Sequence, residues 1–247
     1  MGDISVREYI RWLPADPSEP TSTIVLTTPK RLFVDLRVLK PTVQKHGDDA
    51  GGDVTLPLSR LDWAIAGTSS SALVPSRGDP SQQIRHGKWA HWINSRRPDC
   101  DQIVDEGDMF DVPSDPSLTL ETGRMLNPAT GVETDYEEVW RSEPIEDVFE
   151  GGLTCLALRM ENDTEAGKVR RGLLVRLGQY CQAFARDGDS ITVERLKWDA
   201  EQQRWVTQVR IGDQPLPTEV ATYFAHETTL DDEVKVGDTV WKVVEKA

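Results

Sequence analysis

Apolar residues in this chain recur mainly at every second position, and this spacing limits the possible folds more than any other feature. In residues 32–38, every even position is apolar, whereas Asp35 and Arg37 are charged. A period of two places alternate side chains on opposite faces of a β-strand. The segment therefore predicts a strand with one face on a core and the other in solvent.

Further strands are predicted along the whole chain. Alternation or short apolar runs typical of strands occupy residues 24–26, 61–66, 132–140, 153–160, 172–184, 191–198, 204–211, 234–236 and 239–244. Turn signals separate several of these segments, at residues 27–30, 127–131, 199–203 and 237–238. Many short antiparallel strands with little helix predict a sandwich or a barrel, and a closed barrel removes exposed sheet edges.

Three segments do not fit the strand pattern. A short helix is predicted at residues 218–224, with Thr218 as its N-cap. Two long loops are predicted, Lys45–Asp53 because it is rich in Gly and Asp, and Thr68–Ser81 because it is rich in Ser, Pro and Gly.

The chain has 247 residues, which suits one large domain or two modest ones. The acidic, turn-prone segment 142–152 is the best candidate for a boundary. We therefore expect an N-terminal β-barrel domain at residues 1–146 and a C-terminal one at 147–247.

The charge and cysteine content exclude several classes of protein. A formal net charge of −14 disfavours nucleic acid and anionic membrane surfaces as partners. The three cysteines, Cys100, Cys155 and Cys181, are odd in number and widely spaced, which argues against a disulfide framework and a zinc site. No apolar run approaches the roughly 20 residues that span a bilayer. These features predict a cytoplasmic protein, with the nucleus as a second location.

The sequence contains no recognisable catalytic or cofactor motif, so no catalytic residue, metal ligand or cofactor is expected. His86 and His91 are five residues apart, which places them on opposite faces of a strand. Adjacent acids such as Glu137 and Glu138 also face opposite ways, and we expect them on a solvated surface.

The eight tryptophans are more informative. Most lie on predicted strands, and Trp89 and Trp92 should face opposite sides of theirs. One interpretation is that they fill a barrel core. The other is that Trp63, Trp89 and Trp140 line the interior of a barrel and contact a small apolar ligand there.

Four segments also resemble a known family. Residues 63–68 (WAIAGT), 134–140 (TDYEEVW), 171–180 (RGLLVRLGQY) and 237–245 (GDTVWKVVE) are similar, in order and spacing, to blocks of the fungal HRI proteins. This family is named for interaction with a casein-kinase-I homologue. The resemblance implies an all-β fold of two antiparallel lipocalin-like β-barrel domains with little helix. It also implies a protein partner, possible association with that kinase homologue, and no catalytic residues.

Two functional hypotheses follow. In the first, the chain is a non-catalytic adaptor that binds a protein partner. In the second, it carries a small apolar ligand in a tryptophan-lined barrel. An enzyme remains the third alternative, because active sites can be assembled from residues scattered in sequence.

Overall fold

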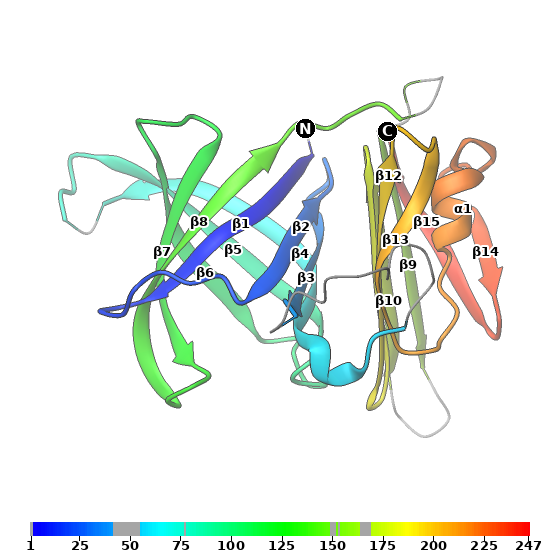
Figure 1. The fold of residues 1–247 in the computed structure, drawn as a ribbon, viewed down its shortest axis with the longest axis horizontal. Helices are drawn as coiled ribbons and strands as arrows, with labels where there is room; N and C mark the ends of the chain where they lie inside the picture. The colour runs from blue at the N-terminus through cyan, green and yellow to red at the C-terminus, as the bar shows by residue number, and fades with distance from the viewer. Residues whose placement is uncertain (1, 42–54, 77, 149–151, 153, 164–168) are drawn as a thin grey trace.

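The first eight strands form a closed antiparallel barrel (Figure 1). Each strand pairs with the next along the chain, and β8 returns to pair with β1. This up-and-down order leaves the barrel without a free sheet edge. The strands are β1 (Asp3–Trp12), β2 (Thr21–Thr27), β3 (Leu32–Leu39), β4 (Leu61–Pro75), β5 (Gln83–Asn94), β6 (Val104–Asp111), β7 (Leu118–Asn127) and β8 (Val132–Glu143), with the 3-10 helix η1 (Leu58–Arg60) before β4.

The later strands form a seven-stranded sheet in the order β13-β12-β11-β10-β9-β15-β14. They are β9 (Cys155–Asp163), β10 (Val169–Leu177), β11 (Tyr180–Asp187), β12 (Ser190–Asp199), β13 (Arg204–Ile211), β14 (Glu233–Val236) and β15 (Thr239–Lys246). The helix α1 (Thr218–Tyr223) packs against β10 and β11 and is followed by the 3-10 helix η2 (Ala225–Glu227). The all-β prediction is confirmed. Unlike the barrel, this sheet has two end strands, β13 and β14, within the described part of the chain.

The computed structural model describes residues 2–41, 55–76, 78–148, 152, 154–163 and 169–247. The predicted loop Lys45–Asp53 lies outside these ranges. Among the described residues, no helix combines the length and apolar character needed to cross a membrane.

Two sequence predictions about strand limits are wrong. Residues 172–184 form two strands, β10 and β11, joined by a tight turn in which Gly178 adopts a positive φ of 52°. Burial on both faces of these strands removes the alternation that would otherwise mark the turn. The predicted loop Thr68–Ser81 is largely strand, because β4 continues to Pro75 and Ser71 pairs with Gly87 of β5.

The predicted short helix is confirmed, but its predicted cap is wrong. Pro217 occupies the N-cap position, and Thr218 lies in the first turn. The Thr218 hydroxyl donates instead to Oε2 of Glu194 on β12, at 2.9 Å. The helix is therefore fixed to the sheet by a side-chain bond.

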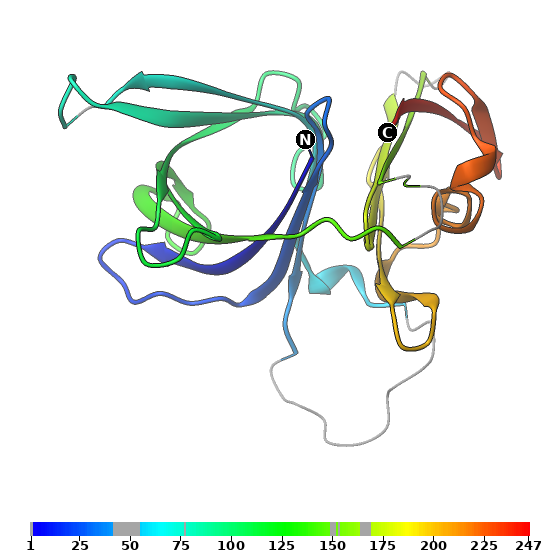
Figure 2. The ribbon, with the colours of Figure 1, turned by 90° about the horizontal axis from the view of Figure 1, so that it is seen from above.

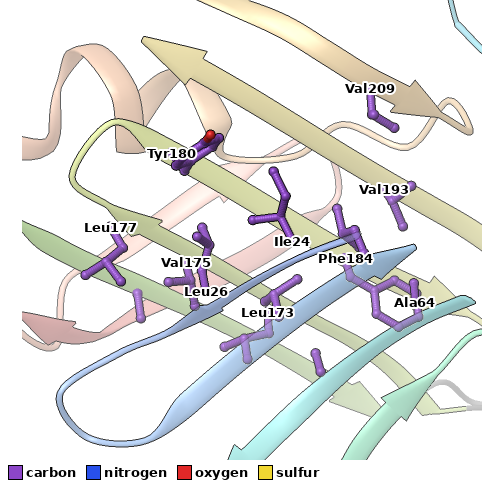
Figure 3. Packing of buried hydrophobic residues seen from close by; sticks show 14 of the residues in the cluster. Ile24, Leu26, Ala64, Leu173, Val175, Leu177, Tyr180, Phe184, Val193 and Val209 are labelled. Carbon is purple, nitrogen blue, oxygen red and sulfur yellow. The ribbon is translucent and has the colours of Figure 1, made fainter. Parts of the chain in front are cut away.

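The barrel and the second sheet share one hydrophobic core. Figure 2 shows the two units side by side, with the wall of β2 to β4 facing the second sheet. Even-numbered residues of this wall, such as Leu26, Leu36 and Ala64, are fully buried in one cluster with Leu173 and Phe184 of the second sheet (Figure 3). The apolar face of the wall therefore lies outside the barrel.

The opposite face of the same wall lines the barrel lumen. Its side chains are the odd-numbered residues, among them Thr23, Val25, Asp35 and Arg37. Asp35 is only 4% exposed. The prediction that the charged face of residues 32–38 lies in solvent is therefore wrong, because the second sheet covers one face and the barrel encloses the other.

Polar side chains of the second sheet add hydrogen bonds to this interface. The Gln182 amide donates to the backbone carbonyls of Ile24 at 3.1 Å and Val34 at 3.0 Å. The Arg195 guanidinium donates to Oε1 of Gln182 at 2.7 Å and to the Leu36 carbonyl at 2.7 Å. Burial lowers the pKa of Arg195 to about 10, so the group still carries its charge at neutral pH.

We predict that Phe184→Ala destabilises the whole chain, because Phe184 is fully buried between the two units. Loss of a buried phenylalanine typically costs about 3–5 kcal/mol. Urea denaturation followed by tryptophan fluorescence would measure the change, and Leu73→Ala is the control because Leu73 is 71% exposed. A loss below about 1 kcal/mol would contradict a shared core.

Candidate ligand-binding cavity

A cavity of about 320 Å³ occupies part of the barrel lumen. All eight strands of the barrel contribute side chains to its wall. Apolar groups from Val25, Phe33, Ile65, Met109 and Met125 form part of the wall. Hydroxyl groups and charged side chains form the rest, so the cavity is amphipathic.

The other part of the lumen is filled by buried polar side chains. Trp63 donates from Nε1 to Oδ1 of Asn94 at 3.0 Å, and Nδ2 of Asn94 lies 3.0 Å from Nδ1 of His91. His91 continues this chain of contacts through Nε2 to Asp105, at 3.0 Å. Asp105 also lines the cavity, so the filled part and the open part of the lumen are connected by hydrogen bonds.

A cluster of buried ion pairs lies where these two parts meet. Arg7 donates to Glu138 and, at 2.8 Å, to Glu19. Arg37 donates from Nε to Oδ2 of Asp35 at 2.9 Å and contacts Glu138 at 3.3 Å. Burial opposes the charge on Arg37, but Asp35 and Glu138 outweigh it and raise the pKa of the guanidinium. Buried charges are tolerated only when they are paired in this way.

Asp35 is incompletely satisfied by this cluster. Its Oδ1 is buried and has no hydrogen-bond partner among the described residues, whereas Oδ2 accepts from Arg37. Burial raises the pKa of Asp35, and the Arg37 charge only partly opposes this. An unsatisfied buried oxygen is costly, and Asp35 is part of the cavity wall. A ligand with a hydrogen-bond donor would remove that cost.

Glu121 on β7 is the second unusual carboxyl group of the wall. It is 6% exposed and accepts from the Tyr136 hydroxyl at 2.8 Å and from Nε1 of Trp140 at 3.0 Å. Burial raises the pKa of Glu121 to about 8, and repulsion from Glu138 adds to the shift. At neutral pH this carboxyl group is therefore mostly protonated.

Three glycines make room for the side chains that form the wall. A Cβ on Gly87 would lie 2.7 Å from the Trp89 ring, and one on Gly107 would lie 2.9 Å from Glu121. A Cβ on Gly123 would lie 2.5 Å from the Tyr136 hydroxyl. Gly87 and Gly107 are also direct cross-strand partners. The three glycines therefore give Trp89, Glu121 and Tyr136 the space that they occupy.

The three tryptophans that were predicted to contact a ligand, Trp63, Trp89 and Trp140, lie in different parts of the lumen. Trp89 and Trp140 line the cavity, whereas Trp63 lies in the filled part of the lumen. Arg96 stacks over the Trp63 ring at 4.3 Å, and Arg37 lies 5.2 Å from it on the inner side. Trp63 therefore helps to close the lumen and is not among the wall residues.

Trp89 and Trp92 face opposite sides of β5, as predicted. Trp89 points into the lumen, whereas Trp92 stacks against Arg159 of the second sheet at 3.9 Å. His86 and His91 also separate: His91 is buried in the lumen, whereas His86 bonds Asp108 at 2.7 Å. Within the described ranges, no group of three or more His, Cys, Asp or Glu residues could hold a metal ion.

The prediction that Glu137 and Glu138 are both solvated is wrong for Glu138. Glu138 is 1% exposed and pairs with Arg7 and Arg37, whereas Glu137 faces outward to Arg11. Sequence reasoning also missed Asp35 and Glu121 as site residues. The strand around Asp35 offers no signal that separates the two cases, since a charged residue there can either face solvent or be buried with a partner.

Geometrically, the chain is an eight-stranded up-and-down antiparallel barrel with an amphipathic internal cavity, joined to a second β-sheet through a shared core. Barrels of this size can hold one small ligand.

Comparison with known proteins identifies the family. The family model described as Protein HRI1 matches residues 3–245, which is nearly the whole chain, and the chain belongs to this family. In the sequence comparison with curated proteins, none matches.

The fold is shared with a solved structure from yeast. The crystal structure of the uncharacterized protein YLR301w from Saccharomyces cerevisiae superimposes with a TM-score of 0.72 at 16% sequence identity. The match covers 100% of this chain and 99% of the yeast chain. At this identity the likeness concerns the fold.

We predict that Glu121 makes the stability of the protein depend on pH. The unfolded carboxyl group has a pKa near 4.3, so between about pH 5 and 8 the folded chain holds a proton that the unfolded chain has released. Stability should therefore fall as pH rises through this window, by on the order of 2 kcal/mol between pH 6 and 8.

Urea denaturation at pH 6, 7 and 8 would measure this slope. Glu121→Gln should flatten it, and Glu133→Gln should leave it unchanged because Glu133 is well exposed. An identical slope in the Glu121 variant would show that this group does not titrate in the window.

Proposed function

We propose that the barrel binds a small amphipathic molecule in its lumen, so that the chain acts as a ligand-binding protein. The observation that carries the proposal is the cavity of about 320 Å³ with an unsatisfied Asp35 oxygen in its wall. Small-molecule sites typically have volumes of roughly 300–1,000 Å³ and a few converging polar groups within an apolar lining.

The character of the wall refines the hypothesis of a purely apolar ligand. Trp89, Trp140 and Phe33 provide aromatic surface, but Asp35 and Glu121 are polar and buried beside them. A wholly apolar ligand would leave Oδ1 of Asp35 without a partner. A ligand with one apolar part and one polar group therefore suits the wall better.

Native mass spectrometry of protein purified from its own host tests the proposal. We expect an added mass of a few hundred daltons that is lost on denaturation. Val25→Phe should abolish the added mass, because Val25 lines the cavity and a larger ring would occupy it. Leu126→Phe should retain it, since Leu126 is 57% exposed on β7.

Matching urea midpoints of the two variants would show that both fold. A bare chain mass for the unsubstituted protein would contradict a tightly held ligand. An added mass that persists in Val25→Phe would place the ligand outside the lumen.

A second candidate function is that of an adaptor for a protein partner. The large side chains of Tyr223, which ends α1, and of Phe224 and Leu230, which follow it, are 46%, 43% and 51% exposed. Figure 1 shows α1 on the side of the second sheet that faces away from the barrel. Exposed aromatic side chains are common anchors of protein interfaces. This surface does not overlap the lumen, so the two proposed functions are compatible in one molecule.

The casein-kinase-I homologue suggested by the family resemblance supplies the partner for a test. We expect Phe224→Ser to weaken binding at least tenfold, as loss of an anchor residue does. Phe110→Ser is the control, because Phe110 is 36% exposed on the barrel. Surface plasmon resonance with the purified kinase homologue would measure both variants. Equal affinities for the two variants and the unsubstituted chain would exclude this surface.

A further inference from the structure

The buried part of the cavity wall carries more carboxyl groups than cations. Asp35, Glu121 and Glu138 are 4%, 6% and 1% exposed. Arg37 is the one cation of the wall that is similarly enclosed among the described residues, with its side chain 11% exposed. All three carboxyl groups act electrostatically on this single guanidinium. With all three carboxyl groups ionised the wall would have a deficit of positive charge, and in the empty lumen the proton held by Glu121 offsets it.

The buried guanidinium groups already have partners. Arg37 is held between Asp35 and Glu138 and lies against the Trp63 ring. Arg7 is held by Glu19 and Glu138. An anionic ligand would have to compete with these bonds and would also face the buried carboxyl groups.

Two of the three carboxyl groups, in contrast, are incompletely compensated, because Arg37 reaches only one oxygen of Asp35 and no described cation forms an ion pair with Glu121. Oδ1 of Asp35 has no hydrogen-bond partner among the described residues. In the described structure Glu121 accepts hydrogen bonds from neutral groups, the Tyr136 hydroxyl and the Trp140 indole. A donor that carries positive charge would satisfy Asp35 and compensate Glu121 at once.

The aromatic side chains of the wall fit the same chemistry. Trp89 and Trp140 line the cavity together with Phe33. Tryptophan is the best aromatic partner for a cation, and its ring also packs against apolar groups. The wall therefore offers surface for both the charged and the apolar part of an amine.

From this geometry we propose that the lumen selects a small organic amine, whose ammonium group donates to Asp35 beside Glu121 while its apolar part packs against Trp89 and Trp140. The inference deepens the proposed function and rests on it. Arg31 and Arg85 also border the cavity, but both are solvent-exposed, so their charges are screened by water.

Binding of the amine is coupled to proton release from Glu121. In the empty lumen, burial and Glu138 favour the protonated carboxyl group, and Arg37 with the bonds from Tyr136 and Trp140 opposes them. The positive charge of a nearby ammonium ion would, like that of Arg37, lower the pKa of Glu121 and favour its carboxylate form. The ligand therefore replaces a proton as the balancing charge.

Three probes of similar shape test the class of ligand: phenethylamine, 2-phenylethanol and 3-phenylpropanoate. Isothermal titration calorimetry at pH 7.5 should show the amine binding at least tenfold more tightly than either of the others. Asp35→Asn should reduce affinity for the amine at least tenfold. Glu133→Gln is the matched control, because it removes one exposed acid and should leave affinity unchanged.

Titrations of the unsubstituted protein in buffers of different ionisation enthalpy supply a second readout that needs no variant. We expect a net release of protons with the amine and none with the alcohol. Amine binding without proton release would overturn the role of Glu121. If Asp35→Asn does not fold, Glu121→Gln replaces it, and that variant should bind the amine without releasing protons.

The outcomes distinguish the amine as ligand from the binding function of the lumen. Equal binding of all three probes, or preference for the carboxylate, would overturn the amine as ligand and leave a binding lumen. Failure of all three probes together with an added mass in native spectra would also overturn the amine alone. Failure of all three probes together with a bare chain mass would overturn the proposed function itself.

Discussion

The wall formed by β2 to β4 is covered on both faces, and the rest of the structure depends on this constraint. One face packs against the second sheet through residues such as Leu36 and Phe184, and the other faces the lumen. A strand has only two faces, so the apolar face must be outside if the second sheet is to bury it. The polar face is then enclosed in the barrel, which is the reverse of the usual small barrel with an apolar interior.

Charges enclosed in this way must be compensated inside the lumen. Arg7 and Arg37 share Glu138, and this pairing offsets much of the cost of removing the groups from water. The compensation is incomplete at Asp35 and Glu121, where burial raises the pKa values. Sites with shifted pKa values and open space beside them are commonly functional. The same imbalance that weakens the fold is therefore the feature on which the proposed ligand binding rests.

The sequence predicted the class of fold well, because a period of two reports directly on strand geometry. The turns at residues 27–30 and 127–131 were also predictable from Gly, Pro and Asn chemistry. Alternation does not reveal which face is inside, so the burial of Asp35 could not be predicted from residues 32–38 alone. The pairing of Glu138 with Arg7, 131 residues away, depends on barrel closure. Strands buried on both faces, β10 and β11, lose the alternation that would have marked the turn between them.

The alternation along β3 also means that odd and even positions of the strand can change independently in evolution. In the proposed ligand-binding function, odd positions such as Asp35 can change to suit a different ligand while even positions such as Leu36 keep the two units joined. A substitution in this wall therefore alters one face only, whereas insertion of one residue moves the side chains that follow it to the opposite face. Residues that face the lumen can therefore diverge among relatives of this chain without any change in how the two units pack together, provided that the length of these strands is kept.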